Sequence, residues 1–400
     1  MKILHTADWH LRGKDLDEAS KCLAYLIGKA SEIEPDFIVI AGDETDSNEV
    51  RLDSQVTELL LSTIAKLAEI APLIICGGTP YHEGSIADRL RLVNQKFPIH
   101  TFTRPGQTEI PGGWNRSAFF TVIPQPTKKF IEMSGTLAET DGTIENGMGV
   151  ILASMGGKSA ISALPHILVG HWTVGGAYIS ENQQMIGRDI EISKDQITLA
   201  RADLVCLGHI HKAQQIEPNI FYSGSLYSLN AGELDAKGFW LHTMAEDGTW
   251  DHKFYRTPAI KRLVVDYDFT DGDGFSEQAL LDAICKYSPQ DIEGAKLHIR
   301  LRLYQDEADK INQERVEELL AHKDRFPQQV IFERIRVPRQ NIRAKNILKL
   351  SRLRDKLQEL ARVRGEELSL AILEKADTLE STLPDKLIEA IENEATGLRN

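Results

Sequence analysis

The feature that most constrains this chain is a set of short apolar runs in its first half, most of which lead directly into Gly, Asp or His. Continuous runs of Val, Ile and Leu of this length are typical of strands buried on both faces. The runs are Lys2–Leu4, Phe37–Ile40, Leu73–Cys76, Phe119–Ile123, Val150–Ala153, Ile167–Val169 and Leu204–Leu207. Helical stretches over Leu16–Ile33 and Ser54–Ile70 separate some of them. This alternation predicts an α/β layer architecture.

Five of the predicted strands are followed closely by Asp or His, the types of side chain that commonly bind transition-metal ions. In open α/β sheets, ligands gather beyond the carboxyl ends of the strands, where glycine lets the backbone approach closely. Two carboxylates and five imidazoles fall there: Asp8, His10, Asp43, His82, His171, His209 and His211. A single His after a strand is usually structural, but the joint pattern is much less expected by chance. A cluster of His and Asp favours a divalent transition metal over calcium.

Such a cluster suits two-metal hydrolysis of a phosphoester. An aspartate such as Asp43 can bridge two ions about 3.5–4 Å apart, which activate a water and stabilise the attacked phosphorus group. The leaving oxygen of a phosphodiester also benefits from a proton donor, and a His with a pKa near neutral suits that role. The residues are therefore compatible with two-metal phosphoester chemistry.

The order and flanks of these motifs resemble the calcineurin-like metallophosphoesterase superfamily. Within it, HTADWHL and FYSGSLYSLNAGELDAKGFWL resemble the opening and a later segment of the SbcD nuclease family, the bacterial relatives of the double-strand-break repair nuclease. The likeness covers residues 1–242. The motifs that carry it are DxH (Asp8, His10), GD (Gly42, Asp43), GGTPYHEG, VGH (His171) and GHIH (Gly208–His211).

The resemblance implies a role for each of these side chains. The first ion would be held by Asp8, His10, Asp43 and His211. The bridging Asp43 would hold the second ion together with His171 and His209. His82 would be the transition-state stabiliser or proton donor. The family usually has GNHD, whose Asn binds the second ion, whereas no Asn precedes His82 in GGTPYHEG. Thr79, a rearranged loop or water would fill that position, and the variant resembles phage or prophage-type members.

The resemblance also implies a fold, an activity and partners. The expected fold is a sandwich of two mixed sheets flanked by helices over residues 1–258, a small α+β capping domain over 260–338, and partner-binding helices over 339–400. The expected reaction is Mn²⁺-dependent hydrolysis of DNA, exonucleolytic at duplex ends, with endonucleolytic cleavage as a further activity. The expected partners are a second copy of the chain and an SbcC/Rad-type coiled-coil ATPase. Because the chain has no GxxxxGK[ST] motif, any ATP dependence would come from that partner.

The second half of the chain has a different pattern. RLVVDYDF, LHIRLRLY and QQVIFERIRV predict strands, and Ser276–Tyr287 and Gln313–His322 predict helices. After Pro338 we expect only helices, with one apolar stripe listed as Leu350, Leu353, Leu357 and Leu360. Residues 334–364 hold eleven Lys or Arg and two acids, whereas residues 366–394 hold nine acids and two Lys. The stripe is predicted to dock a partner, with packing on the chain's own body as the alternative.

Composition narrows the class of protein. No apolar run approaches the ~20 residues that a membrane span needs, and the N-terminal residues do not resemble a signal peptide, so a cytoplasmic protein without a membrane partner is expected. The four scattered cysteines indicate neither a zinc knuckle nor a disulfide scaffold. A net charge of −13 argues against coating nucleic acid through bulk charge, although metal ions and local basic patches still permit a nuclease.

Two rival interpretations remain open at this stage. One is another enzyme of the same superfamily, such as a cyclic-nucleotide phosphodiesterase or a phosphatase. The other is a degenerate, non-catalytic scaffold that binds DNA ends, which the missing Asn favours.

Overall fold

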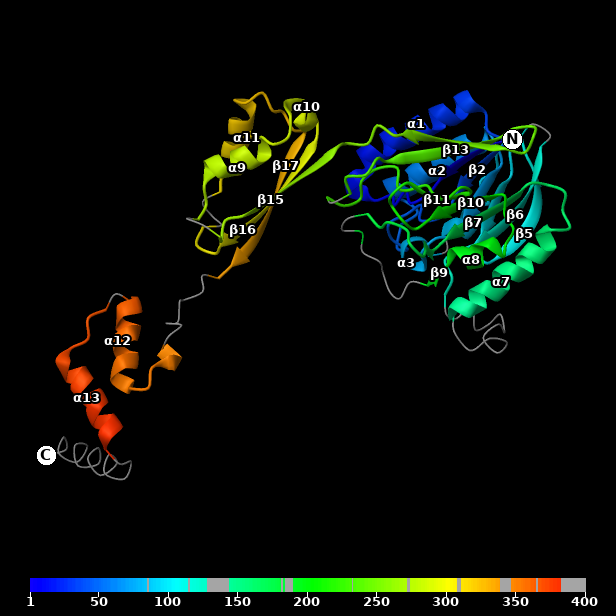
Figure 1. The fold of residues 1–400 in the computed structure, drawn as a ribbon. Coiled ribbons are helices and arrows are strands. Elements are labelled where there is room, and N and C mark those ends of the chain that lie inside the picture. The colour runs from blue at the N-terminus through cyan, green and yellow to red at the C-terminus, as the bar shows by residue number, and fades with distance from the viewer. Residues whose placement is uncertain are drawn as a thin grey trace. The chain divides into compact units, whose positions relative to one another are not determined.

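Figure 1 shows the fold of the chain as a computed structural model. The structure describes residues 1–84, 86–113, 116–127, 144–180, 183, 190–231, 233–271, 274–307, 311–338, 347–364 and 366–382. The chain divides into two compact units. The first comprises Met1–Tyr267, Glu277–Arg300 and Asn312–Glu333, and the second comprises Asp268–Ser276, Leu301–Ile311 and Arg334–Asn400.

The first large sheet lies in the first unit and has the strand order β14-β13-β1-β2-β3-β4. Its parallel strands are β1 (Lys2–Thr6), β2 (Phe37–Ile40), β3 (Leu73–Cys76) and β4 (Ile99–Phe102). The antiparallel strands are β13 (Gly238–Met244) and β14 (Trp250–Arg256). Every residue of β2 and β3 is buried, as the apolar runs predict. Helices α1 (Leu16–Ile33) and α2 (Gln55–Ala68) cover the outer face of this sheet (Figure 1).

The second large sheet has the order β11-β12-β10-β7-β6-β5. Its parallel strands are β6 (Ser117–Ile123), β7 (His166–His171), β10 (Leu204–Gly208) and β12 (Ile220–Tyr222). The antiparallel edges are β5 (Gly106–Pro111) and β11 (Gln214–Glu217). The two sheets share a core that includes Val39 and Ile74 from the first and Phe120 and Val169 from the second. The predicted sandwich of two mixed sheets flanked by helices is therefore confirmed.

The strand predicted over Val150–Ala153 is wrong, because this run lies inside helix α7 (Ile144–Ser159). The buried side chains Met148, Ile151 and Leu152 recur at helical spacing and pack on the outer face of the second sheet, while Val150 is exposed. A short apolar run does not distinguish a buried strand from one face of a helix.

The loops of the sandwich carry several short elements. These are the 3₁₀ turn η1 (Gly13–Asp15), α3 (Pro80–Glu83), α4 (Ile86–Leu90), β8 (Thr173–Val174), β9 (Glu191–Ile192) and α8 (Lys194–Thr198). Ser193 begins α8 with a capping box, in which its hydroxyl accepts a hydrogen bond from the backbone N–H of Gln196.

The elements predicted after residue 260 are confirmed within a few residues. Strands β15 (Arg262–Asp268), β16 (Lys296–Tyr304) and β17 (Gln329–Val337) form a three-stranded sheet in that order. The accompanying helices are α9 (Glu277–Ile284), α10 (Pro289–Ile292) and α11 (Gln313–Ala321). The domain boundaries at 258–260 and 338–339 stay predictions.

The described residues after Pro338 form the 3₁₀ turn η3 (Ile347–Lys349) and helices α12 (Leu353–Arg364) and α13 (Leu370–Ser381). Residues 339–346, 365 and 383–400 of the predicted helical region lie outside the described residues. Leu350 precedes α12, so three of the four stripe leucines lie on that helix. Arg354 of the basic helix pairs with Asp377 of the acidic one, so these opposite charges meet within the chain. Among the helices that the structure describes, none is long and apolar enough to cross a membrane.

Candidate metal centre

The loops that carry the predicted ligands begin at the carboxyl ends of β1, β2, β3, β7 and β10. Parallel pairing brings the ends of neighbouring strands to the same edge of each sheet. Four ligand candidates have positive φ, with 51° at Asp8, 41° at His10, 55° at Asp43 and 89° at His209. Such backbone conformations are costly for residues other than glycine and persist where the surrounding structure imposes them, often at functional sites.

The first ligand group consists of Asp8, His10 and His211, whose ligand atoms all lie within 4.8 Å of one another. All three side chains are buried. Neither ring nitrogen of His10 forms a hydrogen bond of good geometry within the described chain, although Nδ1 lies 3.4 Å from Oδ1 of Asp46. Its Nε2 lies 4.0 Å from Oδ1 of Asp8 and 3.6 Å from Oδ2 of Asp43. A buried imidazole nitrogen without a partner fits a metal ligand, because leaving it unbonded in the core is costly.

The second ligand group consists of Asp43, His171 and His209, and its ligand atoms also lie within 4.8 Å of one another. Nδ1 of His171 donates to the carbonyl of Ala41 at 2.7 Å, which leaves Nε2 facing Oδ2 of Asp43 at 3.2 Å. The backbone N–H of His209 donates to Asp8 at 2.9 Å and so links this loop to the first group. Since Asp43 approaches both His10 and His171, it occupies the position that a bridging ligand needs.

Thr79 belongs to the loop in which related sequences have the Asn that binds the second ion, and it contacts Asp43. Its backbone N–H donates to Oδ1 of Asp43 at 2.6 Å, and its hydroxyl donates to Oδ2 at 3.1 Å. The same hydroxyl is 3.4 Å from Nε2 of His171. The preceding Gly78 is required because a Cβ there would overlap the Asp43 carboxylate. The Thr79 hydroxyl therefore lies at the second ligand group, and its role as the ligand in place of Asn stays a prediction.

His82, on the short helix α3, lies beside the first group. Its Nδ1 donates to the carbonyl of Asp46 at 3.0 Å, and its ring centre is 4.6 Å from that of His10. With Nδ1 holding a proton for this bond, Nε2 is the atom that can exchange a proton with a substrate. The side chain is only partly buried, so a substrate can reach it.

A sequence profile of calcineurin-like phosphoesterases matches residues 1–213, which is more than half of the chain. The chain belongs to the calcineurin-like phosphoesterase family. Proteins of this family are metal-dependent hydrolases that use divalent ions, and the two groups of Asp and His ligands in this phosphoesterase fit such ions.

Two solved structures resemble the phosphoesterase. One is described as GAP50, the anchor in the inner membrane complex of Plasmodium, with 15% identity and a TM-score of 0.42, covering 64% of this chain and 85% of that one. The other is the calcineurin-like phosphoesterase YfkN from Bacillus subtilis, with 13% identity and a TM-score of 0.33, covering 64% of this chain and 90% of that one.

The electrostatics of the phosphoesterase site keep Asp43 ionised. Burial by itself would raise the pKa of Asp43, but the neighbouring His171 and His10 outweigh burial and hold it well below its usual range. Burial opposes protonation of His171, yet the Asp43 carboxylate outweighs burial and raises the pKa of His171 to about 10. In the metal-free chain this pair therefore holds a proton that a metal ion would displace.

Three further side chains that the sequence motifs did not indicate also lie at the site: Glu233, Lys237 and Asp46. Glu233 is 1% exposed and accepts a hydrogen bond from Nδ1 of His211 at 2.9 Å, while Nζ of Lys237 lies 2.8 Å from its other oxygen. Asp46 lies 3.4 Å from Nδ1 of His10. The segment AGELDAKGF contained the signal for Glu233 and Lys237, because it follows the GHIH ligands closely in sequence.

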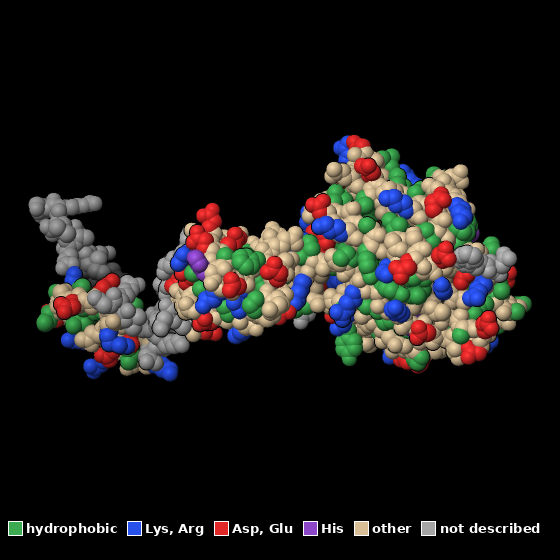
Figure 2. All heavy atoms as spheres, turned by 90° about the horizontal axis from the view of Figure 1, so that it is seen from above, with side chains coloured by type: hydrophobic (Ala, Val, Ile, Leu, Met, Phe, Trp, Pro, Cys, Tyr) green, Lys and Arg blue, Asp and Glu red, His purple; other side chains and the backbone are tan. Residues whose placement is uncertain are grey.

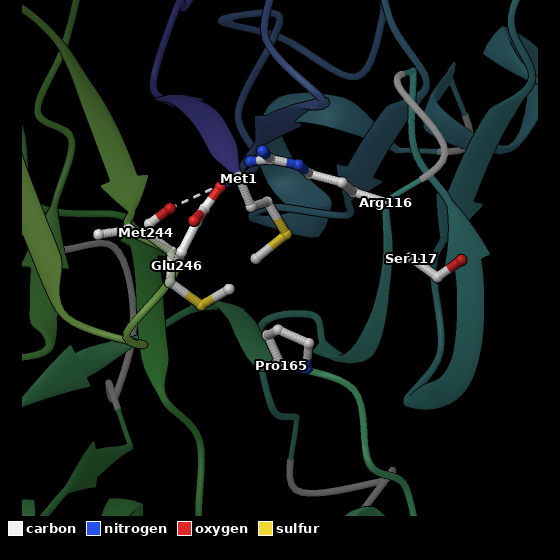
Figure 3. Close-up of a pocket in the computed structure, with 7 residues that line it drawn as sticks. Met1, Arg116, Ser117, Pro165, Met244 and Glu246 are labelled. Atoms are coloured by element: carbon white, nitrogen blue, oxygen red, sulfur yellow. Dashed lines mark hydrogen bonds between the residues drawn. The ribbon is translucent and has the colours of Figure 1, made fainter.

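A surface pocket of about 350 Å³ lies away from this centre (Figure 3). Met1, Ser117 and Pro165, at or just before the amino ends of β1, β6 and β7, line it together with Arg116 and Glu246. The metal ligands gather at the opposite, carboxyl ends of the strands. The pocket contains none of the predicted ligands, so it is not the site of phosphoester chemistry.

Proposed function

We propose that this phosphoesterase is a Mn²⁺-dependent DNA nuclease, exonucleolytic at duplex ends and capable of endonucleolytic cleavage. The observation that carries the proposal is the pair of adjoining ligand groups with Asp43 between them and His82 at their rim. Two bound divalent ions would supply an activated water and neutralise the charge of the phosphodiester.

The chain's own residues then have distinct tasks. Asp8, Asp43 and the four ligand histidines hold the ions, and the strained loops fix their positions. His82, oriented by its bond to Asp46, donates a proton to the leaving oxygen. A proton donor matters for a phosphodiester because its leaving alkoxide is a poor leaving group.

Features around the site favour DNA over a small ester. Tyr81 is 62% exposed and lies next to His82, and Tyr178 is 73% exposed with Nζ of Lys212 5.5 Å from its ring centre. Exposed aromatic rings stack on bases, which contributes about 1–3 kcal/mol per base. Basic and acidic side chains are interspersed over the face seen in Figure 2.

The resemblance to SbcD nucleases supports the same proposal. The segment that carries it, FYSGSLYSLNAGELDAKGFWL, supplies the Glu233 that orients His211. By the same resemblance we propose that the nuclease dimerises and that residues 339–400 dock a coiled-coil ATPase.

The test compares two substrates on the full-length chain with Mn²⁺: an end-labelled DNA duplex and bis(p-nitrophenyl) phosphate. We expect Asp43→Asn and a chelator to abolish cleavage of both substrates. Tyr81→Ala should slow DNA cleavage alone. Hydrolysis of the small ester with intact DNA would instead support a cyclic-nucleotide phosphodiesterase or phosphatase. Failure to bind metal or to hydrolyse either substrate would support the non-catalytic scaffold.

A further inference from the structure

A separate cluster of side chains that can bind a metal ion lies in the core between the two large sheets. His5 on β1 and His242 on β13 belong to the first sheet, and Cys206 on β10 belongs to the second. Their ligand atoms all lie within 4.8 Å of one another, and all three side chains are fully buried. None of the three belongs to the Asp and His groups at the carboxyl ends of the strands.

One nitrogen of each imidazole contacts a neighbouring group, and the other nitrogen faces the second imidazole of the cluster. Nε2 of His5 donates to the carbonyl of Leu207 at 3.2 Å, so the lone pair of its Nδ1 faces Nε2 of His242. Nδ1 of His242 is 2.8 Å from Nδ1 of the partly buried His252, and in the tautomer with the proton on Nδ1 of His242, Nε2 also presents a lone pair. Metal-binding histidines typically donate their second N–H to a carboxylate, a backbone carbonyl or water, as His5 does to Leu207.

The spacing of these two free nitrogens fits a tetrahedral ion. Nδ1 of His5 and Nε2 of His242 are 3.4 Å apart. Two nitrogens each bound at 2.0–2.1 Å to tetrahedral zinc are about 3.3–3.4 Å apart. In the absence of an ion, a proton on one of these nitrogens would form a long hydrogen bond to the other.

We propose that His5, Cys206 and His242 form a structural binding site for a thiophilic transition-metal ion of the zinc type. The ion would join the two sheets directly beneath the loops that carry Asp8 and His209. Two imidazoles and one thiolate are ligands that zinc prefers, and a water completes four-coordination. Binding releases the thiol proton of Cys206 to solvent and leaves both imidazoles neutral.

The protonation states of the cluster agree with this assignment. Burial lowers the pKa of His5 to about 3 and lowers that of His242 well below its usual value, so both rings are neutral as ligands must be. Burial raises the pKa of the Cys206 thiol, so its proton leaves only when a metal ion takes its place.

Cobalt(II) provides a probe that separates this site from the catalytic ions. A thiolate ligand gives cobalt an intense charge-transfer absorption in the near ultraviolet, and the two catalytic groups contain no cysteine. Because the cluster is closed to solvent, the full-length chain is unfolded and then refolded either with Co²⁺ alone or with Co²⁺ and increasing amounts of Zn²⁺. We expect a thiolate band that saturates at one cobalt per chain and decreases as zinc takes the place of cobalt during refolding.

Cys206→Ala should abolish the band and remove one tightly bound zinc per chain. Cys22→Ala, which alters another fully buried cysteine, is the matched control and should retain both. Zinc should raise the melting temperature more in the wild-type chain than in Cys206→Ala. A refolded wild-type chain without the band would overturn the proposal, whatever the folding of the variants. A band that persists in Cys206→Ala would also overturn it.

Discussion

Replacing Glu233 with glutamine tests how the first ligand group is held in position. Glu233 accepts hydrogen bonds from His211 Nδ1 at 2.9 Å, Leu229 N at 3.0 Å, Asn230 Nδ2 at 3.0 Å and Lys237 Nζ at 2.8 Å. Burial by itself would raise the pKa of Glu233, but the hydrogen bond from His211 and the charge of Lys237 outweigh burial and lower it. Glutamine keeps the shape of the side chain and removes its charge.

This substitution should lower both the free energy of unfolding and the affinity for the first metal ion. Lys237 is only 5% exposed, so removing its counter-charge leaves a buried, uncompensated cation. Breaking a buried ion pair in this way costs about 3–5 kcal/mol in the free energy of unfolding. His211 loses the carboxylate that orients its ring, which typically weakens metal binding about 10–100-fold.

The two losses are measured by different assays. Denaturant unfolding in chelator gives the free energy of unfolding without metal, and calorimetric titration with Mn²⁺ gives the affinity of the first ion. The control is Glu217→Gln, because Glu217 forms an exposed ion pair with Lys194 in which each side chain is 41% exposed. That variant should lose at most about 1 kcal/mol and bind metal normally.

A double variant sharpens the test. Adding Lys237→Met to Glu233→Gln removes the unpaired cation, so it should recover much of the stability while metal binding stays weak. The reasoning fails if Glu233→Gln loses less than about 1 kcal/mol and binds Mn²⁺ like the wild-type chain, since the buried contacts would then contribute neither stability nor orientation.

Four further predictions concern other parts of the chain. His82→Ala should keep its metal content while turnover falls about 10²–10⁴-fold, and a loss of bound metal would identify His82 as a ligand instead. Thr79→Val should weaken the second ion alone in a Mn²⁺ titration, and unchanged binding would show that the hydroxyl is not a ligand. Removing residues 339–400 should spare ester hydrolysis and abolish co-purification with the coiled-coil ATPase, whereas retained co-purification would refute docking through this region. Burial lowers the pKa of His166 in the folded chain, so the free energy of unfolding should decrease as pH falls below about 6.5, and His166→Gln should show a shallower decrease in acid unfolding curves.

The sequence by itself determined the main elements of the sandwich and pointed to the Asp and His side chains that the structure brings together in two groups. Runs such as Phe37–Ile40 and Leu73–Cys76 are apolar throughout, and a strand covered on both faces buries every side chain of such a run. The parallel arrangement of Lys2–Thr6 and Phe37–Ile40 brings the carboxyl ends of these strands together, so the sequence predicts Asp8 and Asp43 to be neighbours. The Val150–Ala153 run was misassigned because its length alone does not separate a strand from a buried helical face.

Only the tertiary structure decided which side chains meet across long distances in the sequence. Asp46 reaches His10 through a loop, and Glu233 reaches His211 because β10 and the segment after β12 return to the same edge. His5 and Cys206 come from strands of different sheets, and no local pattern relates them. Periodicity specifies which face of an element is buried, whereas the partner across that face depends on how the sheets stack and twist.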